Sequence, residues 1–562
     1  SKPNSFKLLV NGVESSKVDV IAAEFKDFFT SKVSTLKKEP SLDPIISALQ
    51  EKYVDAAQWD LKPCNSTDIV VAIDRLKNSR CAGPDNISNC LIKHLKHVIA
   101  PDIAFLINES ISSGTFPSCW KVGKICPIPK KGPQSDVKNF RPICLSSNLG
   151  KLSESLIRNQ VSSFIDKQLP DNFHGFRKEK STETALCSLV DQIREHRAAG
   201  RKVALLALDA SAAFDLLSHS LILKSLAVLG AGPLMLRWTE NLLYNCEYFV
   251  QVGDSRSESW FSTDVGVGQG KQFSPELFNV GTISQPLWCP DSSGVHFADD
   301  GGDIIVADTE AECQELIQKV AEKKAEWFHL AGLSLNAKKS ELIGFGFTPA
   351  PITIEGETVH PATSITFLGA IIDNKLNWDL HISKLCDKIR WQAGRIRNEG
   401  HLLKVRDRKI LLHAWILSRV HNNALAFLPS LGQGQLAAIQ TAVNAGVRAV
   451  LDLPRRSNTS ISECCKKIGI PSVIDIRDQC LFKAAYRNRQ KYRDQSQARE
   501  GPLTRSRARG EIPHPIIKGQ KGKMSSTLTD AAWNNLPQHL KDSENDEEAI
   551  GAIKLLYKSS NV

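Results

Sequence analysis

The sequence predicts a folded body of mixed α+β or α/β class, followed by an all-helical region. The apolar run "VALLALDASAAFD" begins with the pattern of a strand that is buried on both faces. In "GVHFADDGGDIIVA", residues 294–307, short apolar runs flank two adjacent aspartates and predict a β-hairpin. After Asn377 the pattern becomes mainly helical, as in "HISKLCDKIRWQAGRIR". Alternating strands and helices therefore predict the body, and the later helices predict a second domain.

The composition is typical of a globular intracellular protein. Its 562 residues are enough for two to four domains, and the net charge of +10 indicates an anionic partner. Fourteen cysteines without a Cys-x-x-Cys pair support neither a zinc site nor a disulfide framework. Without a membrane-length apolar run or a signal peptide, we expect a nuclear or cytoplasmic protein that is not secreted and has no membrane partner. Because the chain starts at Ser1, we expect it to be a piece of a longer protein.

The first elements precede the strand that ends at Asp209. Residues 1–95 are predicted to form an N-terminal extension or linker, with helical patches and no cluster of catalytic residue types. Gly83-Pro84-Asp85 predicts a turn before a helix. Short strands then flank a basic turn at Lys130-Lys131-Gly132, and a helix follows Asn148.

Two helices are marked after that strand. The first is expected from Ser218 to Leu229. The second is "DTEAECQELIQKVAEKKAEWFHLAG", which has one apolar face. Thr309 and Glu312 form a candidate capping box at its start, and Gly332 ends it.

Asp299 and Asp300 are expected at the tip of the hairpin, with Gly301 and Gly302 supplying the turn. Asp-Asp-Gly is also an ordinary turn sequence, and a lone Asp at a strand end, such as Asp209, is more often a helix cap. Two carboxylates ~4 Å apart repel by roughly 4 kcal/mol at an effective dielectric near 20, and a hard cation would remove this repulsion. If the strands are neighbours, the three carboxylates converge and can hold two Mg²⁺ ions for in-line phosphoryl transfer.

Two further segments indicate contact with phosphate or nucleic acid. The glycines of "DVGVGQGKQFSPELFN" do not form a phosphate loop, because Gly270-Lys271 is followed by Gln272 instead of Ser or Thr. A backbone that lets a base pair approach closely is the better explanation. The segment from Arg487 to Lys523 holds eleven Lys or Arg against three acidic residues. It predicts a flexible basic linker that either binds a phosphate backbone or is only a solvated spacer.

Taken in order, these motifs resemble the reverse transcriptase of non-LTR retrotransposons, most closely the Jockey-type elements of animals. "NFRPICLSSNLGKLSESL" and "HGFRKEKSTETAL" are similar to the fingers motifs, "LDASAAFD" to motif A and "GVGQGKQFSPELFN" to motif B. "FADD" resembles motif C, "GLSLNAKKSEL" motif D, and "ITFLGAIIDNKLNWDLHI" the segment that leads into the thumb. "AAWNNLPQHL" is similar to the closing segment of such polyproteins, so the likeness runs from about Phe6 to Leu556.

The resemblance implies an α+β right-hand polymerase. Fingers and an antiparallel palm sheet would occupy residues 96–372, a helical thumb residues 373–480, and a basic linker with a C-terminal segment residues 481–562. The implied activity is RNA-directed DNA polymerisation, with an RNA template, a DNA primer or target, and dNTPs as partners. The implied cofactor is a pair of Mg²⁺ ions, with Mn²⁺ as the alternative.

The resemblance also implies roles for single residues. Asp209, Asp299 and Asp300 would hold the two metals. Phe214, five residues beyond Asp209, would be the steric gate that excludes a ribose 2′-hydroxyl, although an ordinary core aromatic is the alternative.

Four further residues would contact the nucleotide. Gln269 would support the incoming nucleotide, and Arg141 and Lys151 would face its triphosphate. Lys339 would donate a proton to pyrophosphate, with the adjacent Lys338 as the alternative.

The sequence departs from the family in motif B, where Pro-Gln-Gly-Ser-Val-Leu-Ser-Pro is usual. Gly268 replaces the first proline, and Lys271, Gln272 and Phe273 replace the three residues after the central glycine. We expect these changes to loosen the loop, so one alternative function is a catalytically decayed remnant that only binds nucleic acid. A structural ribonucleoprotein component that acts through its basic linker is another. The family's upstream endonuclease and Cys-rich knuckle are not found, so we do not expect this chain to nick a target.

Overall fold

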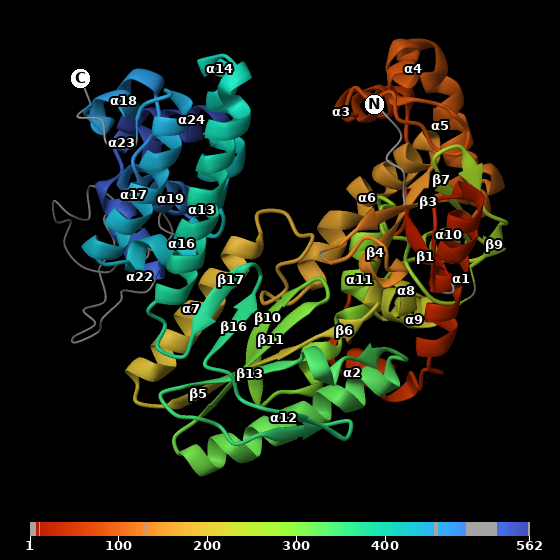
Figure 1. Ribbon diagram of the computed structural model, residues 1–562. Coiled ribbons are helices and arrows are strands. Elements are labelled where there is room, and N and C mark those ends of the chain that lie inside the picture. The colour runs from red at the N-terminus through yellow and green to blue at the C-terminus, as the bar shows by residue number, and fades with distance from the viewer. Residues whose placement is uncertain are drawn as a thin grey trace.

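The structure is a computed structural model that describes residues 7–10, 12–130, 132–262, 264–454, 459–489, 525–543 and 545–559. Figure 1 shows two arms that rise from a common base. The base holds the sheet that carries the aspartates, one arm holds the N-terminal segments, and the other holds the C-terminal helices.

The base is built on a four-stranded antiparallel sheet. Its order is β10 (Ser292–Phe297), β11 (Asp300–Ala307), β5 (Lys202–Leu208) and β13 (Glu341–Phe345). The predictions of an antiparallel palm sheet and of neighbouring aspartate strands are therefore confirmed.

The central strand β5 supplies two hydrophobic cores, because alternate residues of a strand point to opposite faces. Val203 and Leu205 pack with α7 (Thr182–Ala198), whereas Ala204 and Leu206 pack on the face covered by α12 (Glu310–Leu330). The prediction of a strand buried on both faces is confirmed.

The hairpin tip differs from the prediction. Phe297 pairs with Asp300, so Ala298 and Asp299 form the two-residue turn, and Ala298 has a φ of 56°. Gly301 and Gly302 lie inside β11, and the prediction that they supply the turn is wrong. A Cβ on Gly302 would lie 3.1 Å from the ring of Phe367, so the glycine is needed for close packing beneath the hairpin.

The fingers sheet has the order β4 (Phe140–Ser146), β3 (Val122–Pro129), β7 (Glu247–Val252) and β8 (Ser255–Arg256), and β9 (Trp260–Phe261) also pairs with β7. The N-terminal helix α1 (Val18–Leu36) packs against this sheet. Phe25 and Phe29 of α1 share a core with Phe140, and the Phe25 and Phe140 ring centroids are 4.9 Å apart.

The C-terminal arm is helical, as predicted. Helices α13 (Asp379–Glu399), α14 (Val405–Leu412), α17 (Gln433–Val450) and α19 (Val473–Arg487) share the second core, which reaches the palm through β16 (Ser364–Phe367) and β17 (Ala370–Asp373). The segment "AAWNNLPQHL" lies on α22 (Ser525–Asn535) and α23 (Gln538–Lys541), where Trp533 packs in a small core with Tyr486 of α19. The predicted basic linker lies outside the described residues from position 490 onward.

The remaining elements connect these layers. The helices are α2 (Asp43–Lys52), α3 (Ser66–Arg75), α4 (Asn89–His94), α5 (Lys96–Ser113), α6 (Asn148–Gln168), α8 (Ala213–Leu216), α9 (His219–Val228), α10 (Pro233–Leu243), α11 (Ser274–Thr282), α15 (Ser418–His421), α16 (Ala424–Phe427), α18 (Ile461–Ile468) and α24 (Asp546–Ser559). The strands are β1 (Leu8–Val10), β2 (Val13–Ser15), β6 (Ala210–Ser211), β12 (Ser334–Leu335), β14 (Ile352–Ile354) and β15 (Glu357–Val359). Among the helices described, none has the length and apolar character needed to cross a membrane.

Helix α12 has a capped start and a glycine after its end, and its middle is fixed to the palm sheet. Thr309 caps its start by accepting a hydrogen bond from the Glu312 amide, and Gly332 follows its end with a φ of 72°. In the middle, Lys324 Nζ lies 2.9 Å from Asp303 Oδ1 of β11, and both side chains are almost completely buried. Asp303 also accepts a hydrogen bond from the Ser292 hydroxyl at 3.0 Å. The ion pair therefore ties α12 to both strands of the aspartate hairpin.

Replacing Lys324 by Met would leave the Asp303 carboxylate buried without its partner charge. We expect the free energy of unfolding, measured by chemical denaturation, to fall by about 3–5 kcal/mol. Lys323→Met is the matched control, because Lys323 pairs with Glu326 on the same helix with both side chains about half exposed. The expected loss for this exposed pair is much smaller, because solvent screens its charges. Equal losses in the two variants would contradict the role given to the buried pair.

Candidate active site

The palm brings the three predicted carboxylates to one end of the sheet. Asp209 directly follows β5, Asp299 lies in the hairpin turn and Asp300 begins β11. The pairing of Leu208 with Gly301 sets Asp209 next to the hairpin tip. Burial and the charge of Asp299 raise the pKa of Asp209, against the opposing effect of Lys339. Desolvation, then the charges of Asp299 and Asp209, raise the pKa of Asp300 to about 6, although that residue is exposed.

This cluster has the chemistry of a divalent-cation site. Its donors are carboxylate oxygens, which suit a hard cation, and the negative charge of Asp299 contributes by repulsion to the raised pKa values of Asp209 and Asp300. A cation would relieve that repulsion. Within the described ranges, however, no three His, Cys, Asp or Glu side chains already form a metal-binding group. The residues therefore fit a metal ion by charge and donor type.

The two candidate lysines of motif D have different surroundings. Lys339 Nζ lies 3.7 Å from Asp209 Oδ2, and its side chain is 70% exposed. Lys338 pairs instead with Glu357 of β15 at 3.3 Å. The backbone also links this segment to the site, because the Asn336 amide donates to the Asp209 carbonyl at 2.8 Å. Of the two lysines, the proton-donor hypothesis is therefore compatible with Lys339.

A loop from the second fingers motif supports the hairpin from behind. The amide of His296 donates to the Asn172 carbonyl at 2.9 Å, and the His174 amide donates to the His296 carbonyl at 2.7 Å. His296 is buried, and this burial lowers its pKa to about 3. A Cβ on Gly175 would lie 2.5 Å from the Ala298 nitrogen, so the loop backbone touches the hairpin turn.

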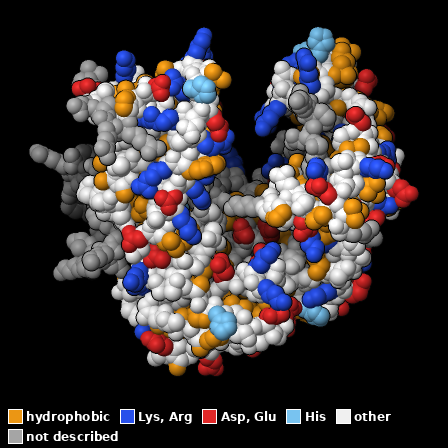
Figure 2. Space-filling model, in the orientation of Figure 1, with side chains coloured by type: hydrophobic (Ala, Val, Ile, Leu, Met, Phe, Trp, Pro, Cys, Tyr) orange, Lys and Arg blue, Asp and Glu red, His pale blue; other side chains and the backbone are white. Residues whose placement is uncertain are grey.

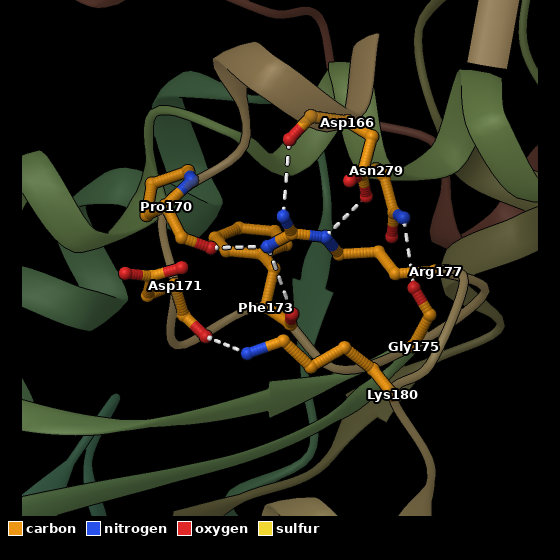
Figure 3. Close-up of polar contacts among 8 residues, drawn as sticks. All are labelled: Asp166, Pro170, Asp171, Phe173, Gly175, Arg177, Lys180 and Asn279. Carbon is orange, nitrogen blue, oxygen red and sulfur yellow. Dashed lines mark hydrogen bonds and ion pairs between the residues drawn. The ribbon is translucent and has the colours of Figure 1, made fainter. Parts of the chain in front are cut away.

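Arg177 holds this loop in shape, as Figure 3 shows. Its guanidinium donates to the Asp166 carboxylate at 2.6 Å and to the carbonyls of Pro170 and Phe173 at 2.7 and 3.2 Å. On the other side, Asn279 of α11 donates to the Gly175 carbonyl at 2.9 Å. The hairpin is thus supported by a loop that is itself anchored to two helices.

Phe214 lies between the core and the open side of the site. Its ring stacks on Phe278 at 4.2 Å with an interplanar angle of 8°, and the exposed Phe176 meets it edge-on at 6.1 Å. The Phe214 carbonyl accepts a hydrogen bond from the Val267 amide at 2.8 Å. This half-buried position fits a gate as well as a core aromatic, so the gate remains a prediction.

The motif B loop is anchored, contrary to the expectation that its substitutions loosen it. Lys271 Nζ lies 3.2 Å from Cys246 Sγ and near the ring of Tyr248. The buried Glu154 accepts hydrogen bonds from the two amides that follow Lys271, at 2.8 and 3.1 Å. Gly270 has a φ of 111°, and a Cβ there would lie 2.6 Å from the carbonyl oxygen of Cys144. At this position glycine is required because the loop contacts the fingers strand β4. This reason differs from the one predicted from the sequence, which was the close approach of a base pair.

Gln269 is held from both sides. Its carbonyl accepts from the Cys144 amide at 2.7 Å, and its Nε2 donates to Asp215 Oδ1 at 3.1 Å. Asp215 directly follows Phe214, so the candidate gate and the candidate nucleotide-support residue are connected.

Three other cations act electrostatically on Lys130. Burial, then the positive charges of Lys32, Arg141 and Lys339, lower the pKa of Lys130. Lys151 is not part of this group: its charge acts on Cys126, Cys144 and Glu154. Arg141 and Lys151 were both predicted to face a triphosphate. Of these two residues, only Arg141 belongs to the group of cations around Lys130.

Lys130, Asp215 and Lys32 were not among the predicted site residues. For Lys130 the available signal was the basic turn, and for Asp215 it was the position directly after Phe214. Lys32 carried no local signal, because it lies in an amphipathic helix far from every motif. Figure 2 shows a cleft between the two arms with Lys and Arg side chains along both edges.

Comparison with known proteins agrees with this geometry. Residues 128–372 match the family model for "Reverse transcriptase (RNA-dependent DNA polymerase)". The chain is 26% identical to "Probable RNA-directed DNA polymerase from transposon X-element" of Drosophila melanogaster, over 72% of this chain and 43% of that protein. It is 24% identical to "RNA-directed DNA polymerase from mobile element jockey" of Drosophila funebris, over 75% of this chain and 48% of that protein. The chain spans less than half the length of each of these relatives.

A solved telomerase structure from Candida tropicalis aligns over 50% of this chain and 60% of its own, with 15% identity and a TM-score of 0.34. The family match covers the end of β3, the palm sheet and the strands up to β17, and it supports the right-hand polymerase fold. Residues 128–372 therefore match the reverse transcriptase family model, and the chain resembles the RNA-directed DNA polymerases of Jockey-type non-LTR retrotransposons.

Proposed function

We propose that this chain is an RNA-directed DNA polymerase that adds deoxynucleotides to the 3′-hydroxyl of a DNA primer along an RNA template. The observation that carries the proposal is the meeting of Asp209, Asp299 and Asp300, with Lys339 next to Asp209 and the charges of Lys339 and Arg141 both acting on Lys130. Phosphoryl transfer needs both groups, because metal ligands must lie next to a surface that neutralises the triphosphate. The names of the relatives support the same activity.

In this proposal the three carboxylates bind two Mg²⁺ ions, with Mn²⁺ as the alternative. Such ions lower the pKa of the attacking hydroxyl and stabilise the leaving pyrophosphate. Arg141 and Lys130 bind the triphosphate oxygens, and Lys339 gives a proton to pyrophosphate. The proximity of Lys339 to Asp209 supports that role.

Two residues select the nucleotide. Phe214 excludes a 2′-hydroxyl by contact with the sugar, and Gln269 supports the nucleotide from the motif B loop. The hydrogen bonds that join both residues to neighbouring backbone and to Asp215 support a fixed pocket wall.

The proposed division of the chain follows the same reasoning. Residues 96–372 would form fingers and palm, residues 373–480 the thumb, and residues 481–562 the linker and C-terminal segment. The separate core shared by α13 and α17 supports a thumb unit. The alternative of a catalytically decayed remnant rested mainly on the altered motif B loop. That loop is anchored through Glu154 and Lys271, so the alternative has less support.

Asp209→Asn and Asp299→Asn should each reduce primer extension on an RNA template by at least roughly 100-fold, because a neutral amide cannot hold the metals comparably. Asp300→Asn should also reduce primer extension, and its reduction should be the smallest of the three. The control is Asp308→Asn, since Asp308 is exposed and lies just past the far end of β11. Near wild-type extension by the Asp209 or Asp299 variant would contradict the metal assignment.

Phe214→Ala should lower the preference for dNTPs over rNTPs more than it lowers dNTP incorporation, since rejection by a packed ring is steric. Competitive primer extension measures the ratio. Phe278→Leu is the control, because it alters the ring stacked on Phe214 without removing the candidate gate. If both variants change the ratio equally, or neither does, Phe214 is an ordinary core residue.

Removing residues 490–523 should weaken RNA binding and reduce its salt dependence, because the segment carries most of the cations of the predicted linker. The deletion spares Arg489, which pairs with Asp546 at 2.6 Å. Extension of a short primer–template at saturating concentration should be retained. Unchanged affinity and an unchanged salt slope would show that the segment is only a spacer.

A further inference from the structure

The side chain of Lys32 connects the N-terminal helix α1 with the candidate nucleotide pocket. Lys32 Nζ lies 3.7 Å from Asp215 Oδ2, while Asp215 Oδ1 accepts the hydrogen bond from Gln269 Nε2 at 3.1 Å. One carboxylate therefore connects a helix of the N-terminal extension with the loop that carries Gln269.

The position of Lys32 is set by the packing of its helix. Phe25, Phe29 and Lys32 are spaced by four and three residues, so they lie on one face of α1. The two phenylalanines are buried in the fingers core. This packing directs Lys32 toward the segment after Phe214, and its side chain is 30% exposed.

Asp215 is tightly enclosed by the motif B loop. A Cβ on Gly266 would lie 2.8 Å from the Asp215 carbonyl oxygen, and the Val267 amide bonds to the Phe214 carbonyl. The Asp215 side chain is only 18% exposed. A shift of this carboxylate would therefore move Phe214 and Gln269 together.

The other lysines of this region have different partners. Lys26 pairs with Glu258, whose side chain is 87% exposed, and Lys37 pairs with the half-exposed Asp264. These pairs attach α1 to the fingers surface. Of the three lysine pairs, only that of Lys32 involves a carboxylate that also holds Gln269.

We propose that Lys32 is a positioning residue for the incoming deoxynucleotide: through Asp215 it fixes Gln269 and Phe214 in the geometry that accepts a dNTP. The inference rests on the proposed polymerase function. It also makes helix α1 a working part of the polymerase and not merely a linker. The charge of Lys32 matters in this role, because Asp215 would otherwise be an enclosed carboxylate with the Gln269 amide and the charge of Lys130 to stabilise it.

The test compares Lys32→Met with Lys32→Arg and the matched control Lys26→Met in the full chain. We expect Lys32→Met to raise the KM for dNTP about fivefold, the scale of one partly buried ion pair, with kcat changed less than twofold. Lys32→Arg should restore most of the loss, and Lys26→Met should resemble the wild type. Affinity for the primer–template should be equal in all four proteins.

A double-mutant cycle with Gln269→Ala tests the connection. If Lys32 acts through Gln269, its effect on KM should shrink in the Gln269→Ala background. Additive effects, or an equal rise of KM in Lys26→Met, would overturn the inference while leaving the polymerase function in place.

Equilibrium binding of a dNTP to the primer–template complex, without turnover, separates the two proposals. If the wild type binds dNTP without extending a primer, the proposed function fails, and weaker binding by Lys32→Met than by Lys26→Met still supports the inference. If these two variants bind dNTP equally, or if the wild type does not bind it, the inference is wrong.

Discussion

The pairing of β11 with β5 is the constraint on which the rest of the structure depends. Its register, from Gly301 opposite Leu208 to Ala307 opposite Lys202, sets Asp209 next to the hairpin that carries Asp299 and Asp300. Like charges brought together in this way favour separation. Three features oppose such a separation. They are the two hydrophobic cores on either side of β5, the buried Lys324–Asp303 pair, and the loop held by Arg177.

The site has two electrostatic halves that adjoin at Lys339. Carboxylates gather at the hairpin, whereas Lys130, Arg141 and Lys32 gather at the fingers turn and the N-terminal helix. A nucleoside triphosphate with its cations has the complementary charge pattern, because the metals need the carboxylates and the phosphates need the lysines and arginine. Neither half is contributed by one continuous segment, so the folded arrangement of fingers and palm creates the site.

Contacts from several elements, including the N-terminal helix, hold the unusual motif B loop at both ends. Lys271 and Glu154 fix the end of the loop that leads into α11, while Asp215 and Lys32 fix Gln269 at its other end. Substitutions that remove a proline from the loop are thus accompanied by polar anchors from three different elements. A loop held at both ends can keep one conformation without the rigidity of proline.

The strands, the long helices, the order of the motifs and the candidate carboxylates could be predicted from the sequence, because periodicity and turn residues are local properties of the chain. Asp209 at the end of a strand and the capped helix after Thr309 are examples. Only the tertiary structure decided which lysine faces Asp209, why Gly302 lies inside a strand, and how Lys32 reaches Asp215. Each of these depends on contacts between segments far apart in the chain, and such contacts are set by how the helices and sheets pack, which leaves no periodic signal in the sequence.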